Sequence, residues 1–474
     1  MSEILNETDL SLQTHFELLS DLQGNILKFH GRTHAFHIFL QFKPEMREVA
    51  RNWIARFNVT SSASQLEDSR LRKSNPLHDG GPFFNFSLSA SGYKALGIPR
   101  NQTPSEGAFL DGLKNRVNVT EDNLDIWEPD FLRQIDALII VADSKISIAT
   151  AEKNRILSEI SGLADIVHVQ KGKILRNANG IGIEHFGYAD GVSQPNFLAN
   201  SDSPATQWDD NGALLNTLLV QEPNQNDIET FGSYFVFRKL DQNVRKFKEK
   251  ETELSKQFNK LSDEEYGIFN RKGKSNQELA GAMIVGRFED GTAVTNHSDE
   301  FGITREDQLE NDFDYRDDLQ GLKCPFHAHI RITNPRQDVS NSFAKSVRLT
   351  RRGIPYNDIG RDEHDLESDQ PEDGVGLLFM CYQKSIAEQF EFIQQAWADH
   401  GEIGRENFVG QDAIIGQGPN STIKSLPGQW NTDSDRQNVP VVFKDFVTMK
   451  GGEYFFTPSI GFLKKLIIGE DLPK

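Results

Sequence analysis

The chain has 474 residues, of which 70 are acidic and 51 are basic, and its formal net charge is −19. Nucleic acids and anionic membrane surfaces both select for clustered Lys and Arg, so this balance argues against either partner. The length exceeds what one hydrophobic core commonly serves, and we expect two large domains, at residues 1–213 and 214–474.

The cysteine content and the N-terminal residues predict a compartment. Only Cys324 and Cys381 occur, which is too few for a disulfide framework and favours a reducing environment. The first residues show neither the basic nor the apolar region of a signal peptide, and the apolar run from Ala137 to Ala142 is far shorter than the about 20 residues that span a bilayer. We therefore expect a cytoplasmic protein without a transmembrane segment.

The first half of the chain alternates strand-like and helix-like segments. The strands show apolar residues at a period of two, and the helices show them at three- and four-residue steps. In chain order the pattern predicts a strand at His34 to Phe42, a helix at Pro44 to Phe57, strands at Phe84 to Leu88 and Ala137 to Val141, a helix at Ile146 to Ile160 and a strand at Ile166 to Val169.

The second half continues this alternation, with two polar segments that we interpret as surface loops, Asn200 to Asp227 and Asn357 to Gly374. Short alternating strands favour an antiparallel α+β sheet with helices on one face. The predicted elements are strands at Tyr234 to Phe237, Val375 to Tyr382 and Tyr454 to Phe456, a helix with Val244, Phe247, Leu254, Phe258 and Leu261 on one stripe, and a helix with Ile386, Phe390, Ile393 and Trp397 on another.

A first motif of chemical interest is Gly187-Tyr188-Ala189-Asp190-Gly191. Because glycine tolerates positive φ and has no Cβ, a carboxylate between glycines lies where the backbone can turn sharply and approach a ligand. Ordinary turns have the same composition, so this motif alone does not identify a function.

Two further motifs follow, at residues 324–336 and 351–356. In the strand that residues 328–333 suggest, His327 and His329 point to the same side, and spacing alone does not choose between them. With Cys324 they could bind zinc, and they could equally be histidines without a ligand role.

Together the three motifs resemble the dye-decolorizing peroxidases, a family of haem enzymes. The segments Leu22 to Leu27 and Phe446 to Ser459 look like the longer-chain branch of that family, so the resemblance extends over practically the whole chain. It implies an α+β fold of two ferredoxin-like domains with antiparallel β-sheets and peripheral helices, in which the C-terminal domain holds most of the haem.

The resemblance also implies roles for individual residues around one haem b per chain. It matches His329 to the axial ligand of the haem iron, Asp190 to the acid/base group for peroxide, and Arg351 to the cation beside the departing oxygen. Asp412 is the candidate acceptor for the second N–H of the ligand imidazole. Further pocket candidates are Arg331, which we expect to pair with a haem propionate, Leu377 and Phe379 over the distal pocket, and His297.

Bulky dyes do not fit a pocket sized for peroxide, so electrons have to enter through an oxidisable residue at the surface. Tyr356 and Trp397 are the candidates for this role, although Trp397 also completes a helical apolar stripe.

The sequence thus predicts an oxidoreductase, a haem peroxidase that reduces hydrogen peroxide and oxidises dyes, phenolics or other one-electron donors. The alternative is a haem-binding protein for haem or iron delivery or storage, with incidental peroxidase activity. The expected partners are hydrogen peroxide and small aromatic reductants or dyes. Because members of the family commonly form oligomers, a further expected partner is a second copy of this chain.

Overall fold

The structure of the chain is a computed structural model. It describes residues 3–7, 10–75, 78–198, 214–223, 229–262, 274–303, 310–401, 410–417, 424–427, 430–431, 439–442 and 446–467. Most of the loop predicted at residues 200–227 lies outside this description, and so do the side chains of Phe258 and Leu261 in the predicted helical stripe.

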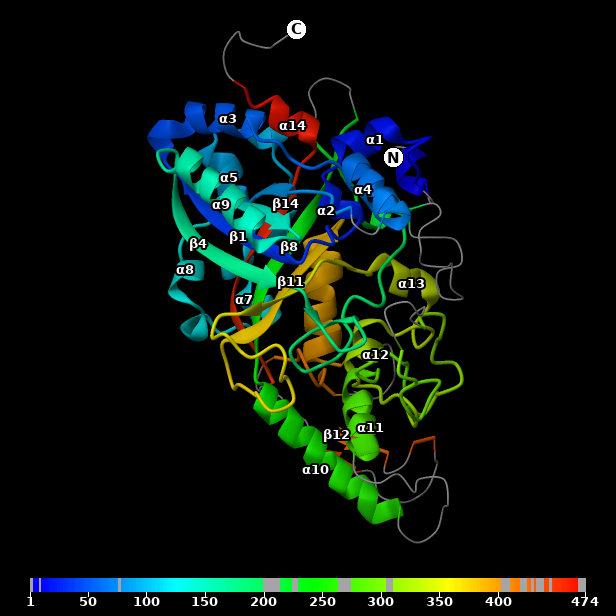
Figure 1. Ribbon diagram of the computed structural model, residues 1–474. Helices are drawn as coiled ribbons and strands as arrows, with labels where there is room; N and C mark the ends of the chain where they lie inside the picture. The colour runs from blue at the N-terminus through cyan, green and yellow to red at the C-terminus, as the bar shows by residue number, and fades with distance from the viewer. Residues whose placement is uncertain are drawn as a thin grey trace.

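A large antiparallel sheet runs through the molecule (Figure 1). Within the described residues it has ten strands, eight of them in the order β10-β11-β8-β14-β2-β3-β1-β4, while β7 pairs with β8 and β9 with β11. The strands are β1 (His34–Phe42), β2 (Phe83–Leu88), β3 (Ala137–Asp143), β4 (Ala164–Lys173), β7 (Val220–Gln221), β8 (Phe231–Gln242), β9 (Thr350–Arg351), β10 (Ile354–Asn357), β11 (Val375–Gln383) and β14 (Val447–Thr457). Two short ribbons pair β5 (Leu175–Arg176) with β6 (Gly182–Ile183) and β12 (Lys424–Leu426) with β13 (Val439–Val441).

The two halves of this sheet share one strand order. In the first half the order is β4-β1-β3-β2. In the second half it is β14-β8-β11-β10, which is the same order when β8, β10, β11 and β14 are counted as the first, second, third and fourth strand. The halves meet where Phe456 of β14 pairs with Leu88 of β2. The predicted antiparallel α+β fold is thus confirmed, and the strands of both halves form one continuous sheet in which β2 pairs with β14.

Helices cover the half of the sheet formed by β1 to β4, and α10 and α11 pack side by side as a hairpin that extends away from it (Figure 1). The α-helices are α1 (Phe16–Asp21), α2 (Gly24–Leu27), α3 (Arg47–Arg56), α4 (Ser62–Ser74), α5 (Ala90–Ala95), α6 (Gly107–Asp111), α7 (Val117–Thr120), α8 (Pro129–Leu132), α9 (Ile146–Ile160), α10 (Val244–Ser262), α11 (Lys274–Val285), α12 (His329–Thr333), α13 (Asn341–Ser346) and α14 (Ile460–Lys464). Short 3-10 helices are η1 (Glu3–Asn6), η2 (Pro44–Met46), η3 (Arg100–Gln102), η4 (Leu113–Asn115), η5 (Leu124–Ile126) and η6 (Leu215–Thr217).

Elements with a strong apolar period lie where the sequence predicts them. The predicted bounds of β1 and α9 are confirmed to the residue. The helix expected at Ile386 to Trp397 is present but winds as two π-helical segments, η7 (Ile386–Glu391) and η8 (Ile393–Asp399). π-helical winding is rare in proteins, and the segments that have it are frequently found at functional sites.

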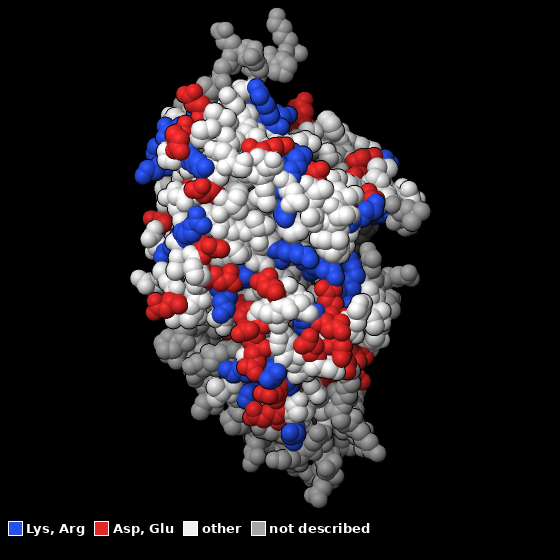
Figure 2. All heavy atoms as spheres, turned by 60° about the vertical axis from the view of Figure 1, so that its left-hand side comes forward, with Lys and Arg blue, Asp and Glu red and all other residues white. Residues whose placement is uncertain are grey.

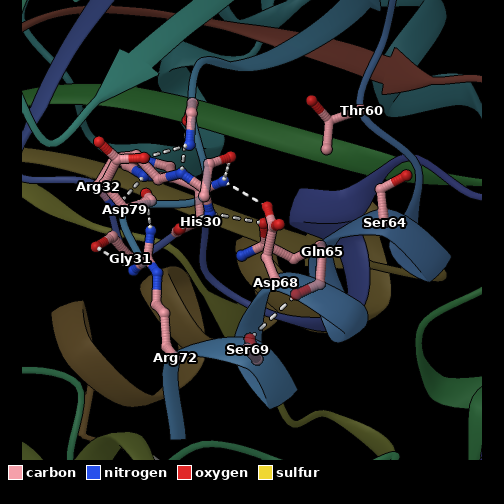
Figure 3. Close-up of polar contacts among 12 residues, drawn as sticks. His30, Gly31, Arg32, Thr60, Ser64, Gln65, Asp68, Ser69, Arg72 and Asp79 are labelled. Carbon is pink, nitrogen blue, oxygen red and sulfur yellow. Dashed lines mark hydrogen bonds and ion pairs between the residues drawn. The ribbon is translucent and has the colours of Figure 1, made fainter. Parts of the chain in front are cut away.

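A buried arginine fixes α4 to the segment that precedes β1 (Figure 3). Arg32 donates to Asp68 Oδ2 at 2.7 Å, to Gln65 Oε1 at 3.0 Å and to the His30 carbonyl at 2.8 Å. A buried cation is tolerated only when its donors are satisfied, and here α4 supplies both acceptor side chains. This network lies in the first half of the chain and is structural.

Acidic side chains gather in the lower half of the face shown in Figure 2, in keeping with the net charge of −19. Across the part of the chain that the structure describes, no helix combines the length and the apolar character needed to cross a bilayer.

Candidate active site

A cavity of about 250 Å³ lies against the half of the sheet formed by the second part of the chain. Because side chains alternate along a strand, β8 points Leu240 and Gln242 into it, and β11 points Leu377 and Phe379. Helices and loops outside the sheet supply further apolar lining residues, namely Val285, Ile330, Val347, Ile393, Ile414 and Ile415. The walls are thus mainly apolar.

The glycine motif contributes Tyr188, Ala189, Asp190 and Gly191 to the lining of this cavity. Gly187 and Gly191 have φ of 107° and 76°, values that favour glycine, so both turns that flank the carboxylate use the glycines as the sequence indicates. The Asp190 N–H donates to the Gly182 carbonyl at 3.0 Å, and the side chain lines the cavity with 27% of its surface exposed.

Arg351 faces this carboxylate. It comes from β9, and its Nη1 lies 4.0 Å from Asp190 Oδ1. The side chain is held by a hydrogen bond from Nη2 to the Ser193 carbonyl at 3.0 Å, and the Arg351 N–H donates to Gln194 Oε1 at 3.0 Å. By contrast, Arg352 is buried and donates to backbone carbonyls outside the cavity. Arg351 is therefore the arginine of the motif that the fold places beside Asp190.

His329 lines the cavity as well, but the segment that carries it is not a strand. Residues 329–333 form the helix α12, and its Ile332 N–H donates to the Ala328 carbonyl at 3.0 Å. Five residues are too few for periodicity to separate a strand from a buried helix, so the strand prediction was wrong. His327 consequently does not share a face with His329, and it is buried away from the cavity.

The zinc alternative depended on His327, His329 and Cys324 converging. Among the residues that the structure describes, no group of three or more His, Cys, Asp or Glu side chains is arranged to hold a metal ion. Cys324 is fully buried and does not line the cavity.

Asp412 fixes the orientation of the His329 ring. Its Oδ2 accepts from His329 Nδ1 at 2.8 Å, and its Oδ1 accepts from the N–H groups of Ile414 and Ile415 at 2.7 and 2.9 Å. The carboxylate is fully buried, which by itself raises its pKa, but the charge and hydrogen bond of His329 and the two N–H donors lower the pKa below its usual value. The pairing leaves Nε2 as the ring nitrogen available to the cavity.

Arg331 does not reach the cavity, contrary to its predicted pairing with a propionate. The residue is fully buried, and its guanidinium donates to the carboxylates of Asp318 and Asp338 at 2.7 to 3.0 Å and to the Cys324 carbonyl at 2.6 Å. A further bond to the Asp318 carbonyl at 2.9 Å occupies its last donor. Arg331 is therefore a structural clamp for the loop that precedes α12.

The remaining candidates also lie outside the cavity lining. The exposed fractions of Tyr356 and Trp397 are only 1%, so neither is the surface residue that dye oxidation requires. Tyr356 donates to Asp241 Oδ1 at 2.7 Å, and Trp397 packs against aromatic neighbours in the core. His297 pairs with Glu310 at 3.2 Å. Tertiary packing, which the sequence does not display, decides all three placements.

Several lining residues were not predicted as part of the site. Ser193 and Gln194 follow the glycine motif directly, and the continuation Val192-Ser193-Gln194-Pro195 was a signal that they accompany Asp190. Arg287 also lines the cavity, where burial lowers its pKa to about 9, and no motif marks it in the sequence.

Comparisons with known proteins point to one family. Residues 193–408 match the family model described as Dyp-type peroxidase, C-terminal. The chain is 36% identical to the multifunctional dye peroxidase DyP2 of Amycolatopsis sp. (strain ATCC 39116 / 75iv2), over 95% of this chain and 96% of that protein. It is 30% identical to the dye-decolorizing peroxidase msp1 of Mycetinis scorodonius, over 95% and 87%.

Solved structures agree with the sequence comparison. The structure of the DyP-type peroxidase AnaPX of Anabaena sp. superposes with a TM-score of 0.86 at 36% identity, covering 98% of this chain and all of that one. The structure of DyP2 from Amycolatopsis sp. gives a TM-score of 0.85 at 34% identity, covering 97% and 99%. The similarity thus includes the whole α+β architecture.

Proposed function

Because the chain belongs to the family of dye-decolorizing, or DyP-type, peroxidases and is an enzyme of that class, we propose that it is a haem peroxidase that reduces hydrogen peroxide and oxidises dyes, phenolics or other one-electron donors. The observation that carries this proposal is the convergence of Asp190, Arg351 and His329 on one cavity. These residues are far apart in the sequence, and only the fold brings them together.

The residues around the cavity fit a haem group. His329 offers Nε2 to an iron while Asp412 holds Nδ1, which is the usual arrangement of a histidine ligand. Apolar walls suit the porphyrin faces, with Leu377 and Phe379 on the sheet side. Arg348 lines the same cavity, and we assign to it the pairing with a propionate. The hydrogen bonds of Arg331 exclude that residue from this role, and Arg336, which also lines the cavity, already donates to Asn311, Phe313 and Ser193.

The haem, once bound, supplies the redox chemistry that cleaves the O–O bond of peroxide and withdraws electrons from the donor. Asp190 takes a proton from one oxygen of peroxide and returns it to the other, since its carboxylate lines the cavity and remains partly accessible to solvent. Arg351, 4.0 Å from that carboxylate, places a fixed positive charge beside the oxygen that leaves.

The matching strand orders of the two half-sheets support a further proposal about the fold, that residues 1–213 and 214–474 are two ferredoxin-like units joined edge to edge. Most of the cavity lining comes from the second unit, and the Asp190 loop is the contribution of the first.

Absorption spectroscopy and steady-state kinetics test the proposed function. Purified protein supplied with haem b is expected to show a Soret band with one haem per chain, and to oxidise a synthetic dye only when hydrogen peroxide is added. A protein that takes up no haem, or that takes it up and turns over no peroxide with any of several dyes and phenols, would contradict the proposal.

A further inference from the structure

The residues that precede Asp190 form a closed loop. Its neck is closed at residues 182–190, where the Asp190 N–H donates to the Gly182 carbonyl at 3.0 Å and Ile183 forms a bridge with Ala189. The loop turns through Gly187, whose φ is 107°. Any group that fixes the inside of this loop therefore also fixes the backbone that carries Asp190.

A single carboxylate occupies the inside of the loop. Glu184 Oε2 accepts from the Phe186 N–H at 2.8 Å, and its Oε1 accepts from the Tyr188 N–H at 2.9 Å. Its backbone participates too, because the Glu184 N–H donates to the Tyr188 carbonyl at 3.1 Å and its own carbonyl accepts from the Gly187 N–H at 3.1 Å. Burial raises the pKa of Glu184 to about 7, and the N–H groups of Phe186 and Tyr188 counter this rise because they donate to the charged form.

The same carboxylate ties the loop to the sheet. Gln242, the last residue of β8, donates its Nε2 to Glu184 Oε2, and both side chains line the cavity. On the outer side, Tyr188 donates its hydroxyl to Glu251 Oε1 of α10 at 2.5 Å. The loop is thus held from the sheet through Glu184 and from α10 through Tyr188.

We propose that Glu184 is a positioning residue for Asp190, acting as the internal template of the loop and setting the place of the catalytic carboxylate relative to Arg351. The inference rests on the proposed role of Asp190. It assigns Glu184 no contact with peroxide. Its effect passes through the two N–H groups of Phe186 and Tyr188.

The matched control is Glu222, which performs the same kind of structural task elsewhere. It is buried, and its carboxylate accepts from the Ser459 N–H at 2.9 Å and from the Ser459 hydroxyl at 2.6 Å. Glu222 is not part of the cavity lining. Glu222→Gln therefore reports the general cost of neutralising a buried carboxylate that binds a backbone N–H.

Hydrogen–deuterium exchange of the full-length protein tests the positioning directly, with or without haem. Because the N–H groups of Phe186 and Tyr188 lose their acceptor, Glu184→Ala is expected to speed exchange at residues 186–190 by about tenfold or more, and Glu184→Gln by less. Glu222→Gln should speed exchange at Ser459 and leave residues 186–190 unchanged. Exchange at 186–190 that is the same in wild type and both Glu184 variants would overturn the proposal.

Kinetics of the haem-loaded enzyme provide the second measurement. We expect kcat/KM for peroxide to fall about tenfold or more in Glu184→Ala, while the KM for the dye and the Soret band stay as in wild type, and Glu222→Gln to keep wild-type values. Unchanged peroxide kinetics in a variant with a loosened loop would overturn the positioning role. If the wild type itself turns over no peroxide, the proposed function fails, and the exchange data still decide whether Glu184 orders the loop. Should Glu184→Ala not fold, Glu184→Gln decides by the same two measurements.

Discussion

Two polar groups of the site, which we call its His329 end and its Asp190 end, are held in different ways. At one end, His329 is held by Asp412, a carboxylate with no solvent exposure that is itself fixed by two backbone N–H groups. At the other end, Asp190 and Arg351 are 4.0 Å apart, and 27% and 33% of their side chains are exposed.

This difference follows the demands of the proposed chemistry. A metal ligand has to keep one tautomer and one orientation through every turnover, and a buried second partner provides that constancy. A group that exchanges protons with an incoming molecule has to remain reachable and able to gain and lose its charge. We therefore expect substitutions at the His329 end to change haem binding, and substitutions at the Asp190 end to change turnover with haem in place.

The largest effect is expected for His329→Ala. Loss of the axial ligand should abolish stable haem binding, measured as the disappearance of the Soret band after reconstitution and desalting. His297→Ala is the matched control, since His297 lies outside the cavity lining and pairs with Glu310. A Soret band of normal position and stoichiometry in His329→Ala would remove the assignment of the ligand.

Asp190→Asn is expected to change peroxide turnover without changing haem binding. The amide keeps the shape of the side chain but does not transfer the proton, so kcat/KM for peroxide should fall by about 10²–10⁴-fold while the Soret band is retained. The same variant distinguishes an enzyme from a haem carrier, because a carrier would keep its function without this carboxylate. Wild-type turnover in Asp190→Asn would show that Asp190 does not transfer the proton.

A smaller effect is expected for Asp412→Asn. The amide has one acceptor oxygen where the carboxylate has two, so it cannot accept both from His329 Nδ1 and from the N–H groups of Ile414 and Ile415. Because the negative charge beside the imidazole is lost as well, haem affinity should fall by about 10–100-fold. Competition for haem with apomyoglobin measures this affinity. If the haem affinity of Asp412→Asn stays constant and only peroxide turnover changes, the assignment of haem binding to the His329 end and of turnover to the Asp190 end is wrong.

Structural features that depend on residues close together in the sequence can be predicted from it, and features that depend on contacts between distant residues cannot. The bounds of β1 and α9 follow from local periodicity, and the turns at Asp190 follow from the flanking glycines. The joining of the half-sheets through Phe456 and Leu88 pairs residues from opposite ends of the chain, and no local pattern displays it.

The same limit applies to the candidate site. Asp190, Arg351 and His329 were found together only because their motifs resemble those of a family, since spacing alone left His327 and His329 undecided. The wrong assignments concern residues whose burial is set by distant partners. Arg331 is saturated by acceptors on either side of it in the sequence, and Tyr356 is enclosed through Asp241 of β8.

Asp399 is a second buried carboxylate, and its pKa shift makes the stability of the protein depend on pH. Asp399 is fully buried at the end of η8, where Gln394 Nε2 and the Gln417 N–H donate to its Oδ1 at 2.8 and 2.7 Å. Burial raises its pKa to about 8, and the nearby Glu121 adds to the rise. Asp412 has the opposite shift because it faces His329.

The raised pKa of Asp399 predicts a decline of stability with pH. An unfolded Asp has a pKa of about 3.9, so between about pH 4 and 8 the folded protein keeps a proton that the unfolded chain has lost. The free energy of unfolding should therefore fall as the pH rises through this range, by at most about 1.4 kcal/mol per pH unit from this group. Asp399→Asn keeps the shape and the acceptor oxygen but does not titrate, so its stability relative to wild type should increase from pH 5 to pH 8. Urea unfolding at pH 5, 6.5 and 8 measures the difference, and parallel curves for the two proteins would show that Asp399 is not protonated in the folded state.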